Sequence, residues 1–423
     1  MNTLLYLLLG LAVFGTLSSL VFLCMAAVAA RRFQLRRRQE KRRSANNRPS
    51  AEKLPLVSLL KPLHGAEPNL EHYLESFFRL NYPQYEILFC ARTEQDCGLQ
   101  LARKVAARHP DIPVRFLTSG TPPWPNARCY SVSVMAAAAK NDLLVITDSD
   151  VLVKPDFLME VVTPFNDPEV GASTCLYVGA APGMGIWAHL EGLGMSVEMA
   201  AGVMVVDMLE GMRFTLGPAM IVRKSALDAC GGFERLGHYY ADDFKLGNLV
   251  AESGRRVVLS THVIDHCIVH NSFRRNFSHQ LNWMKSTRFS RPSGHFGTVL
   301  TFAMPYGLLG AIVAWVLGMP VLGLSLLSLA YVSRVAQSVM VGGWVVGDRD
   351  AYRLAWLYPL RDLLGFVLWV ASYTSREVGW RDDWYRLEEG GLMVLVQPRP
   401  ASSPQAPADT DAATPTAVAD RYS

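Results

Sequence analysis

The chain has 423 residues, of which half are apolar, and its formal net charge is +4. Most of the positive excess lies in one block that follows the first apolar segment, which favours anionic lipid headgroups over nucleic acid as the partner. The seven cysteines show no paired metal-ligand spacing. Their number and spacing favour a reduced cytoplasmic compartment.

The first part of the chain predicts a membrane anchor. Residues 4–30 contain no charged side chain, and at about 1.5 Å per residue they can cross a hydrocarbon core of roughly 30 Å. Residues 31–51 are predicted to form a basic cytoplasmic linker, because the positive-inside rule keeps such a block in the cytoplasm. A cleaved signal peptide would carry its basic residues before a shorter apolar segment, so a retained anchor is favoured.

Further membrane helices are predicted toward the C-terminus. Residues 297–375 are mostly apolar and are expected to hold two or three of them, followed by a membrane-proximal tail at 376–396. Arg361 and Asp362 interrupt the last apolar segment and are expected to neutralise one another inside a helix bundle. Residues 397–423 are Pro, Ala, Thr and Ser-rich and predict a disordered tail.

Residues 52–292 are long enough for one substantial domain, and their first part alternates between strand and helix patterns. Strands are predicted at residues 55–60, 85–90, 113–117 and 142–147, with helices near 70–80, 98–108 and 130–140. This alternation predicts an α/β fold with a mainly parallel, doubly wound sheet that helices cover on both faces.

Two carboxylates one residue apart, Asp148 and Asp150, follow the last of these predicted strands. Ligands of open α/β sheets bind at the carboxyl ends of strands, where this pair could hold a divalent ion and a diphosphate. A solvated loop is the alternative, because Asp and Ser are ordinary turn residues. The chain lacks a Gly-x-Gly-x-x-Gly turn after its first strand and a Gly-Lys-Ser/Thr loop, which argues against dinucleotide oxidoreductases and P-loop hydrolases.

A second pair of carboxylates, Asp242 and Asp243, precedes apolar residues at helical spacing. One interpretation is a helix N-cap, which needs only one of the two. The other is a general base that points into the cleft and polarises an acceptor hydroxyl. The residue pattern gives these two interpretations equal weight.

A third constellation is a helix with one apolar and one basic face. It includes His279, Asn282, Trp283, Lys285 and Arg288. Such a helix could lie on the membrane surface and lead into the next span. Its cations could also neutralise a leaving diphosphate while the Trp packs against the acceptor or the sugar. Both interpretations are compatible.

Two other segments carry residues of potential interest. Residues 183–212 are rich in Met and small residues and predict a buried pair of helices that lines a groove for an acceptor lipid. The run Asp265-His266-Cys267 has metal-ligand residue types, but its alternating positions on an extended strand point to opposite faces. We therefore interpret that run as structural.

In order and spacing, these motifs match a known family. The chain resembles the membrane-bound family 2 and family 21 glycosyltransferases, most closely the ceramide glucosyltransferase group, with hopanoid-associated glycosyltransferases as near relatives. The resemblance rests on five motifs: Val57-Ser58-Leu59-Leu60-Lys61-Pro62-Leu63-His64-Gly65, Asn81-Tyr82-Pro83-Gln84-Tyr85-Glu86, Asp148-Ser149-Asp150, Ala241-Asp242-Asp243 and His279-Gln280-Leu281-Asn282-Trp283.

The resemblance implies a GT-A fold with a mixed, mainly parallel sheet, a UDP-sugar donor and a divalent cation, Mg²⁺ or Mn²⁺. It implies that Asp148 and Asp150 bind the metal, that Asp148 also contacts the diphosphate, and that Asp243 is the base, with Asp242 beside it. It also implies direct displacement with inversion at the anomeric carbon. Lys61, in the opening motif, and Trp283, which matches the family's final motif, are expected on the donor side.

The chain departs from the family pattern at three places. The final motif has Asn282 where the family has Arg and begins with His279, so stabilisation of the leaving group is expected to fall to Arg288 or Lys285. The acidic residue that contacts the nucleoside is expected to be Asp96, with Glu94 as the reserve. A Lys common before the donor strand is replaced by Arg128, which keeps the charge.

The sequence thus predicts an integral, multi-pass protein of the plasma or inner membrane whose catalytic domain faces the cytoplasm. It is expected to transfer glucose from UDP-glucose to ceramide or a similar lipid. Transfer of N-acetylglucosamine to a hopanoid is one alternative. A non-catalytic membrane protein that retains the fold is another, because Asn282 replaces the motif Arg. A processive polysaccharide synthase is disfavoured, because few spans follow the domain.

Overall fold

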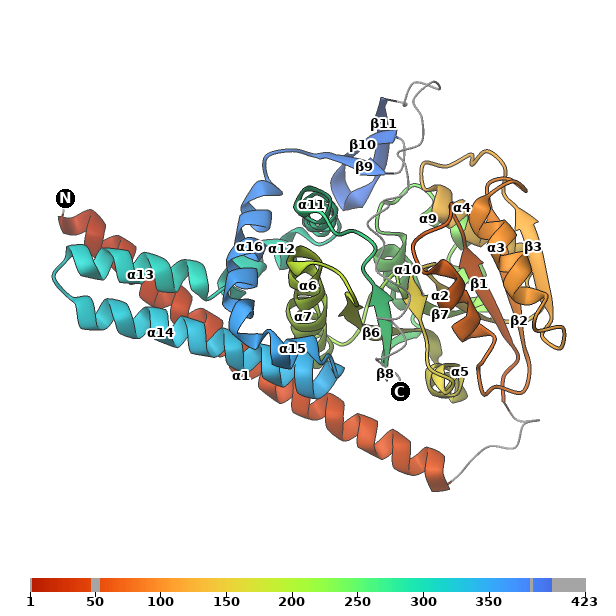
Figure 1. Ribbon diagram of the computed structural model, residues 1–423, viewed down its shortest axis with the longest axis horizontal. Helices are drawn as coiled ribbons and strands as arrows, with labels where there is room; N and C mark the ends of the chain where they lie inside the picture. Colours follow the sequence, from red (N-terminus) through yellow and green to blue (C-terminus); the bar gives the residue numbers. More distant parts are fainter. Residues whose placement is uncertain (1, 47–53, 381–382, 398–423) are drawn as a thin grey trace. The chain divides into compact units, whose positions relative to one another are not determined.

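The computed structural model describes residues 2–46, 54–380 and 383–397, and it divides into two compact units (Figure 1). The sheet unit comprises residues 36–184, 210–270 and those from 377 onward. The helical unit comprises residues up to 35 together with 185–209 and 271–376. The predicted disordered tail lies outside the described residues except for Gln397.

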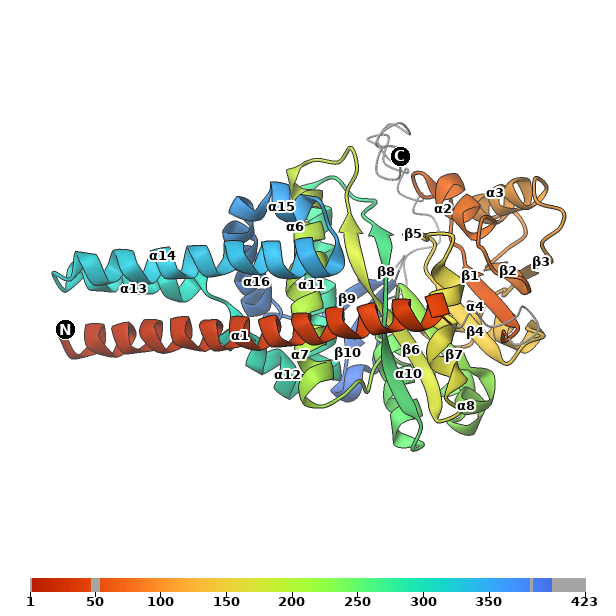
Figure 2. The same ribbon diagram turned by 90° about the horizontal axis from the view of Figure 1, so that it is seen from below.

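The first half of the sheet unit alternates strands and helices, as the sequence predicts. Its elements are β1 (Val57–Pro62), α2 (Leu70–Phe77), β2 (Tyr85–Ala91), α3 (Cys97–Ala106), β3 (Val114–Thr118), α4 (Ala127–Ala138) and β4 (Leu143–Thr147). Strands β1, β2 and β4 are almost fully buried apolar runs, which is typical of strands covered on both faces. Figure 2 shows α2 and α3 on one face of these strands and α4 on the other.

The remaining elements of the sheet unit add four strands and several helices to this sheet. They are β5 (Val151–Leu152), α5 (Phe157–Val162), the 3₁₀-helix Thr163–Asn166, β6 (Val170–Ala180), β7 (Ala219–Arg223), α8 (Lys224–Ala229), α9 (Gly232–Leu236), α10 (Asp242–Glu252) and β8 (Arg256–Cys267). The strand order is β3-β2-β1-β4-β7-β6-β8-β5. Pairs β3–β2, β2–β1, β1–β4 and β6–β8 are parallel and the other three are antiparallel, so the predicted mixed, mainly parallel sheet is confirmed.

A small antiparallel sheet follows near the end of the described chain. Its strands are β9 (Glu377–Trp380), β10 (Asp383–Leu387) and β11 (Met393–Gln397), with a 3₁₀ turn at Glu389–Gly391. Tyr239, which lies just before α10, forms a β-bridge with Leu392, and the Tyr240 amide donates to the Gly391 carbonyl at 3.0 Å. These bonds hold the segment that leads into α10.

The described residues of the helical unit form helices and their connections, with no strand among them. Its elements are α1 (Asn2–Asn46, whose last residues belong to the sheet unit), α6 (Ile186–Leu193), the π-helix Gly194–Met199, α7 (Ala200–Leu209), α11 (Phe273–Ser290), α12 (Pro292–Gly297), the 3₁₀-helix Thr298–Thr301, α13 (Met304–Val316), α14 (Pro320–Gln337), the π-helix Ser338–Val346, α15 (Asp350–Arg353), the 3₁₀-helix Ala355–Leu357 and α16 (Tyr358–Ala371). Leu9 of α1 packs against Val313, Ala314 and Leu326 of α13 and α14.

Three helices among the described residues are long and apolar enough to cross a membrane, namely Asn2–Arg43, Ile186–Leu209 and Pro320–Val346. A fourth candidate is the bent pair Pro292–Thr301 and Met304–Val316, with an angle of 48°. The segment Ile186–Leu209 is one continuous helix, so the predicted pair of helices at residues 183–212 is wrong. The π-helical turn Gly194–Met199 connects α6 to α7 within it.

The predicted pairing of Arg361 with Asp362 is also wrong. Arg361 lies 3.1 Å from Glu198, and Asp362 lies 3.3 Å from Arg334 and accepts hydrogen bonds from the Ala303 and Met304 amides. Neighbours i and i+1 on a helix point in different directions, so each charge finds its partner on another helix.

Candidate active site

Lys61 lies near the C-terminal end of strand β1. Strand β1 runs parallel to β4 in a register that pairs Leu60 with Ile146, so Lys61 reaches the residues just beyond β4. Its Nζ donates to the Asp148 carbonyl at 2.7 Å and to Thr147 Oγ1 at 3.3 Å, and it lies 3.8 Å above the centre of the Phe77 ring. Burial lowers the pKa of Lys61 to about 7, although the charges of Asp150 and Asp148 oppose this shift.

Arg128 joins the two predicted carboxylate pairs. Asn126 caps α4 by accepting from the Cys129 amide, which places Arg128 in the first turn. The Arg128 guanidinium donates to Asp148 Oδ1 at 2.8 Å and to Asp242 Oδ2 at 2.7 Å. A third bond of 3.1 Å goes to the Gly217 carbonyl. Charge-assisted bonds of this kind fix the relative positions of β4 and α10.

Asp150 has one carboxylate oxygen with a partner and one without. Its Oδ2 lies 3.1 Å from His266 Nε2, and its buried Oδ1 has no hydrogen-bond partner among the described residues. Burial opposes ionisation of Asp150, but the charges of His266 and Lys61 hold the pKa of its carboxyl below the usual value. A buried anionic oxygen with no donor is a position where a cation fits.

Glu67 completes this side of the cluster, and no motif in the sequence indicated it. Ser149 Oγ donates to Glu67 Oε2 at 2.9 Å. Burial, followed by the charge of Asp150, raises the pKa of Glu67 to about 8, so this carboxyl is mostly protonated at neutral pH. For His266, the sequence pattern indicated a structural role only. Both residues come from segments far from Asp150 along the chain, and no local spacing indicates their contact.

Asp243 stands at the start of α10 and faces the end of β4. A Cβ atom on Gly217 would lie 3.2 Å from Asp243 Oδ2 and 3.7 Å from Asp148 Oδ2, so glycine leaves the space between the two carboxylates open. Asp243 Oδ1 accepts from its neighbour's amide, that of Phe244, at 2.8 Å. Burial and the charge of Asp242 raise the pKa of Asp243 to about 6.

The structure distinguishes Asp242 from Asp243. Helix α10 begins at Asp242 itself, and its N-cap residue, Ala241, has no capping side chain, so the N-cap interpretation is wrong for both carboxylates. Asp242 is 6% exposed, and its two oxygens accept from Arg128 and from Asn126. Asp243 makes no ion pair among the described residues and lies beside the open space at Gly217.

Asp96 and Glu94 have other partners. Asp96 is the N-cap of α3: its Oδ1 accepts from the Gly98 and Leu99 amides at 2.9 and 3.1 Å. Its Oδ2 accepts from the Gly65 amide at 2.8 Å, so one carboxylate holds the loop after β1 against α3. Glu94 is an exposed partner of Arg103, at 2.6 Å. Contact of either carboxylate with a nucleoside stays a prediction.

The residues of the third constellation belong to the helical unit. His279 Nδ1 lies 3.0 Å from the buried carboxylate of Glu191, and its ring centre lies 4.3 Å from that of Trp283. Arg288 donates to the Ser372 carbonyl and lies 4.9 Å from the centre of the Tyr373 ring. A role of His279, Trp283 or Arg288 in donor binding stays a prediction.

A mixed sheet with helices on both faces and a carboxylate pair after a central strand defines a GT-A-like α/β protein, as predicted. A model of glycosyl transferase family 21 matches residues 19–393, and the chain belongs to this family. The resemblance to the ceramide glucosyltransferase group is thereby confirmed.

Individual relatives differ in how much of the chain they match. Ceramide glucosyltransferase 1 of Caenorhabditis elegans is 32% identical over 209 residues, which are 49% of this chain and 45% of the relative. The alignment therefore spans about half the length of that relative. Ceramide glucosyltransferase 3 of the same organism is 23% identical over 81% of this chain and 74% of its own. Among solved structures, the mannosyltransferase PcManGT from Pyrobaculum calidifontis in complex with GDP-Man and Mn²⁺ is 16% identical, covers 87% of this chain and 99% of its own, and has a TM-score of 0.49.

Proposed function

We propose that the chain transfers glucose from UDP-glucose to the hydroxyl of ceramide or a similar membrane lipid, with inversion at the anomeric carbon. The observation that carries this proposal is the meeting of Asp148, Asp150 and Asp243 with Lys61 and Arg128 at one end of the sheet. The cluster supplies cationic side chains and carboxylates that could hold a diphosphate and its metal ion. It also supplies a carboxylate that could accept the proton of a hydroxyl group. Family membership and the apolar helices support a lipid acceptor.

The residues on the donor side of the proposed site fit a divalent cation. Asp150 fits such an ion because its buried Oδ1 has no partner among the described residues, and Asp148 lies on the same loop. Carboxylate oxygens are the ligands that Mg²⁺ and Mn²⁺ prefer. When bound there, the ion supplies positive charge against the leaving diphosphate. Lys61 holds this loop through the hydrogen bond that it donates to the Asp148 carbonyl.

The acceptor side depends on Asp243. In the proposed reaction the lipid hydroxyl oxygen forms a bond to the anomeric carbon, the bond from that carbon to the diphosphate oxygen breaks, and the hydroxyl proton passes to Asp243. Attack opposite to the leaving group gives inversion. A pKa of about 6 leaves Asp243 ionised at neutral pH while it keeps more basicity than an ordinary Asp. Asp242 holds Arg128 and acts as a positioning residue.

The proposal is tested with purified full-length protein in detergent, given UDP-glucose, ceramide and Mg²⁺ or Mn²⁺. We expect release of UDP and a lipid product whose mass exceeds that of ceramide by one hexose. A parallel reaction with UDP-N-acetylglucosamine and a hopanoid checks the alternative donor and acceptor. Absence of UDP release and of any labelled lipid, in folded protein, would favour the non-catalytic interpretation.

Activity should depend on pH through Asp243. Because the pKa of its carboxyl is raised to about 6, the group is protonated below that pH and cannot accept a proton. We expect kcat/KM to fall roughly tenfold per pH unit below about 6 and to level off above it on this limb. A profile measured with UDP-glucose and ceramide checks this. An acidic limb that stays unchanged in Asp243→Glu would argue against this assignment.

Donor binding should depend on Asp150. Substitution Asp150→Ala removes the buried oxygen that has no partner, and we expect the metal-dependent affinity for UDP to fall at least about tenfold. Calorimetric titration of UDP with and without Mn²⁺ measures the change. Asp167→Ala, which removes an exposed partner of Arg256, is the matched control and should bind UDP normally. Unchanged affinity in Asp150→Ala would contradict the metal assignment.

A further inference from the structure

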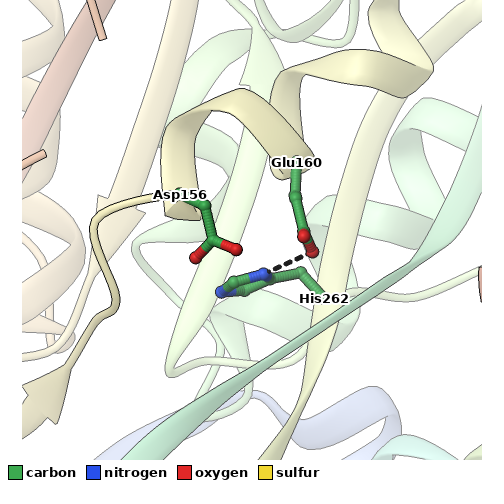
Figure 3. Close-up of side chains that lie close together, drawn as sticks. All are labelled: Asp156, Glu160 and His262. Carbon is green, nitrogen blue, oxygen red and sulfur yellow. Dashed lines mark hydrogen bonds and ion pairs between the residues drawn. The ribbon is translucent and has the colours of Figure 1, made fainter. Parts of the chain in front are cut away.

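A second group of metal-ligand side chains lies in the sheet unit, outside the proposed donor site. Asp156 precedes α5, Glu160 lies one turn later in α5, and His262 lies on β8 (Figure 3). One potential ligand atom from each of the three residues lies within 4.8 Å of the others. Among the described residues, no other set of at least three His, Cys, Asp or Glu side chains has this geometry.

The aromatic core separates this group from the donor site. The Lys61 ammonium lies over Phe77, the Phe77 ring lies 6.4 Å from that of Phe157, and the Phe157 ring lies 5.6 Å from that of His262. These are centre-to-centre distances between packed side chains. The group Asp156, Glu160 and His262 therefore shares no residue with the proposed donor site at Asp148 and Asp150.

The His262 ring has one nitrogen with a partner and one without. Nδ1 lies 2.7 Å from Glu160 Oε2, and the ring is 4% exposed. A carboxylate only accepts hydrogen bonds, so in the neutral form of the ring Nδ1 carries the proton and Nε2 keeps its lone pair for a metal ion. Nε2 is buried and has no hydrogen-bond partner among the described residues. Figure 3 shows the Asp156 carboxylate beside the part of the His262 ring that carries Nε2.

This is the arrangement in which proteins bind a metal through histidine: a carboxylate orients the ring through one nitrogen, and the other nitrogen binds the ion. We propose that His262 Nε2 and Asp156 bind a borderline divalent transition ion such as Zn²⁺, and that Glu160 is the positioning residue for the His262 ring. An imidazole together with a carboxylate suits Zn²⁺ better than Mg²⁺, which prefers oxygen ligands alone.

The charges around the group permit a cation. Asp156 and Glu160 contribute two carboxylates, and His262 and then Lys41 of α1 act electrostatically on Glu160. Thr261, next to His262, donates to Glu40, which holds this end of α1 against β8. The ion would thus join α5 to β8 beside the end of α1, as a structural site that stabilises this edge of the sheet.

The test uses full-length protein in detergent with Asp150→Ala, Cys24→Ser and Cys97→Ser as the common background. This background removes the donor-site ligand and the two exposed cysteines, which could bind zinc themselves. After dialysis against a chelator, Zn²⁺ is titrated calorimetrically, and bound metal and the midpoint of thermal unfolding are measured. We expect one bound zinc per chain and a midpoint that rises with zinc concentration.

Four variants of this background give the expected pattern. Asp156→Asn and His262→Gln should lose saturable binding, and Glu160→Gln should bind zinc about 10–100-fold more weakly. Lys41→Ala should bind it more tightly, because a competing positive charge is removed.

His109→Gln is the matched control. It breaks a His–Glu pair of similar length, 2.9 Å, that has no place in the proposed site, so zinc binding should be unchanged. Absence of zinc binding in the background protein would overturn the proposal, and so would unchanged affinity in Asp156→Asn. Because Asp156 is exposed, its variant should fold even if His262→Gln does not.

Discussion

Replacing Asp243 by Asn should lower kcat for lipid glucosylation by about 10²–10⁴-fold, the usual contribution of a general base. Asparagine has nearly the same shape and can still accept from the Phe244 amide, but it cannot take the acceptor proton. Affinity for UDP should change little, because the proposed donor site lies at Asp148 and Asp150. Initial rates at saturating UDP-glucose and ceramide, together with calorimetric UDP titrations, measure both quantities.

Two comparisons make this test specific. Asp228→Asn is a control in α8, outside the proposed site, and should retain normal rates. If Asp243→Asn keeps normal turnover, Asp243 is not the base. If it loses UDP binding as well as turnover, the carboxylate acts on the donor instead, and the proposed division of roles would be wrong.

Replacing Arg128 by Met should destabilise the sheet unit by about 3–5 kcal/mol, the usual effect of removing one partner from a buried ion pair. The substitution leaves Asp148 and Asp242 without their shared cation and close to Asp243. Thermal unfolding of the full-length protein should show a clearly lower midpoint. Mn²⁺ with UDP should restore part of the loss, because positive charge returns to Asp148.

Arg256→Met is the matched control for this substitution. Arg256 pairs with Asp167 at the same distance, 2.7 Å, but both side chains are largely exposed. Exposed pairs contribute less than about 1 kcal/mol, so this variant should unfold near the normal temperature. Equal destabilisation by the two substitutions would contradict the view that Arg128 neutralises a buried cluster.

The elements that the sequence predicted well are those with a strong local signal. Apolar runs and helical spacing placed β1 to β4 and α2 to α4 within a few residues of their observed bounds. The positions at element boundaries indicated the carboxylate pair after β4 and the pair Asp242 and Asp243, and the family resemblance pointed to Asp243 as the base. The structure adds that Asp148 and Asp243 both lie beside the space at Gly217.

What the sequence did not indicate depends on contacts between distant segments. Glu67 reaches the cluster from the loop after β1, and His266 reaches it because β8 pairs with β5 in a register that places Val151 opposite His266. No spacing along the chain reports such pairings. Adjacency along the chain was also misleading, since Arg361 and Asp362 take their partners from other helices.

The two ion pairs of the helical unit, Glu198–Arg361 and Arg334–Asp362, have a consequence for the assembly of its helices. Glu198 and Arg334 lie in two candidate membrane spans, whereas both of their partners, Arg361 and Asp362, lie in α16. Glu198 and Arg334 place opposite charges in these two candidate spans, and a charge at the centre of a bilayer costs about 2.5–3.5 kcal/mol on insertion scales. Because α16 is synthesised after both spans, its docking supplies the two counter-charges together. Docking of α16 therefore completes the charge pairing of the helical unit, and truncation before α16 would leave Glu198 and Arg334 without these partners.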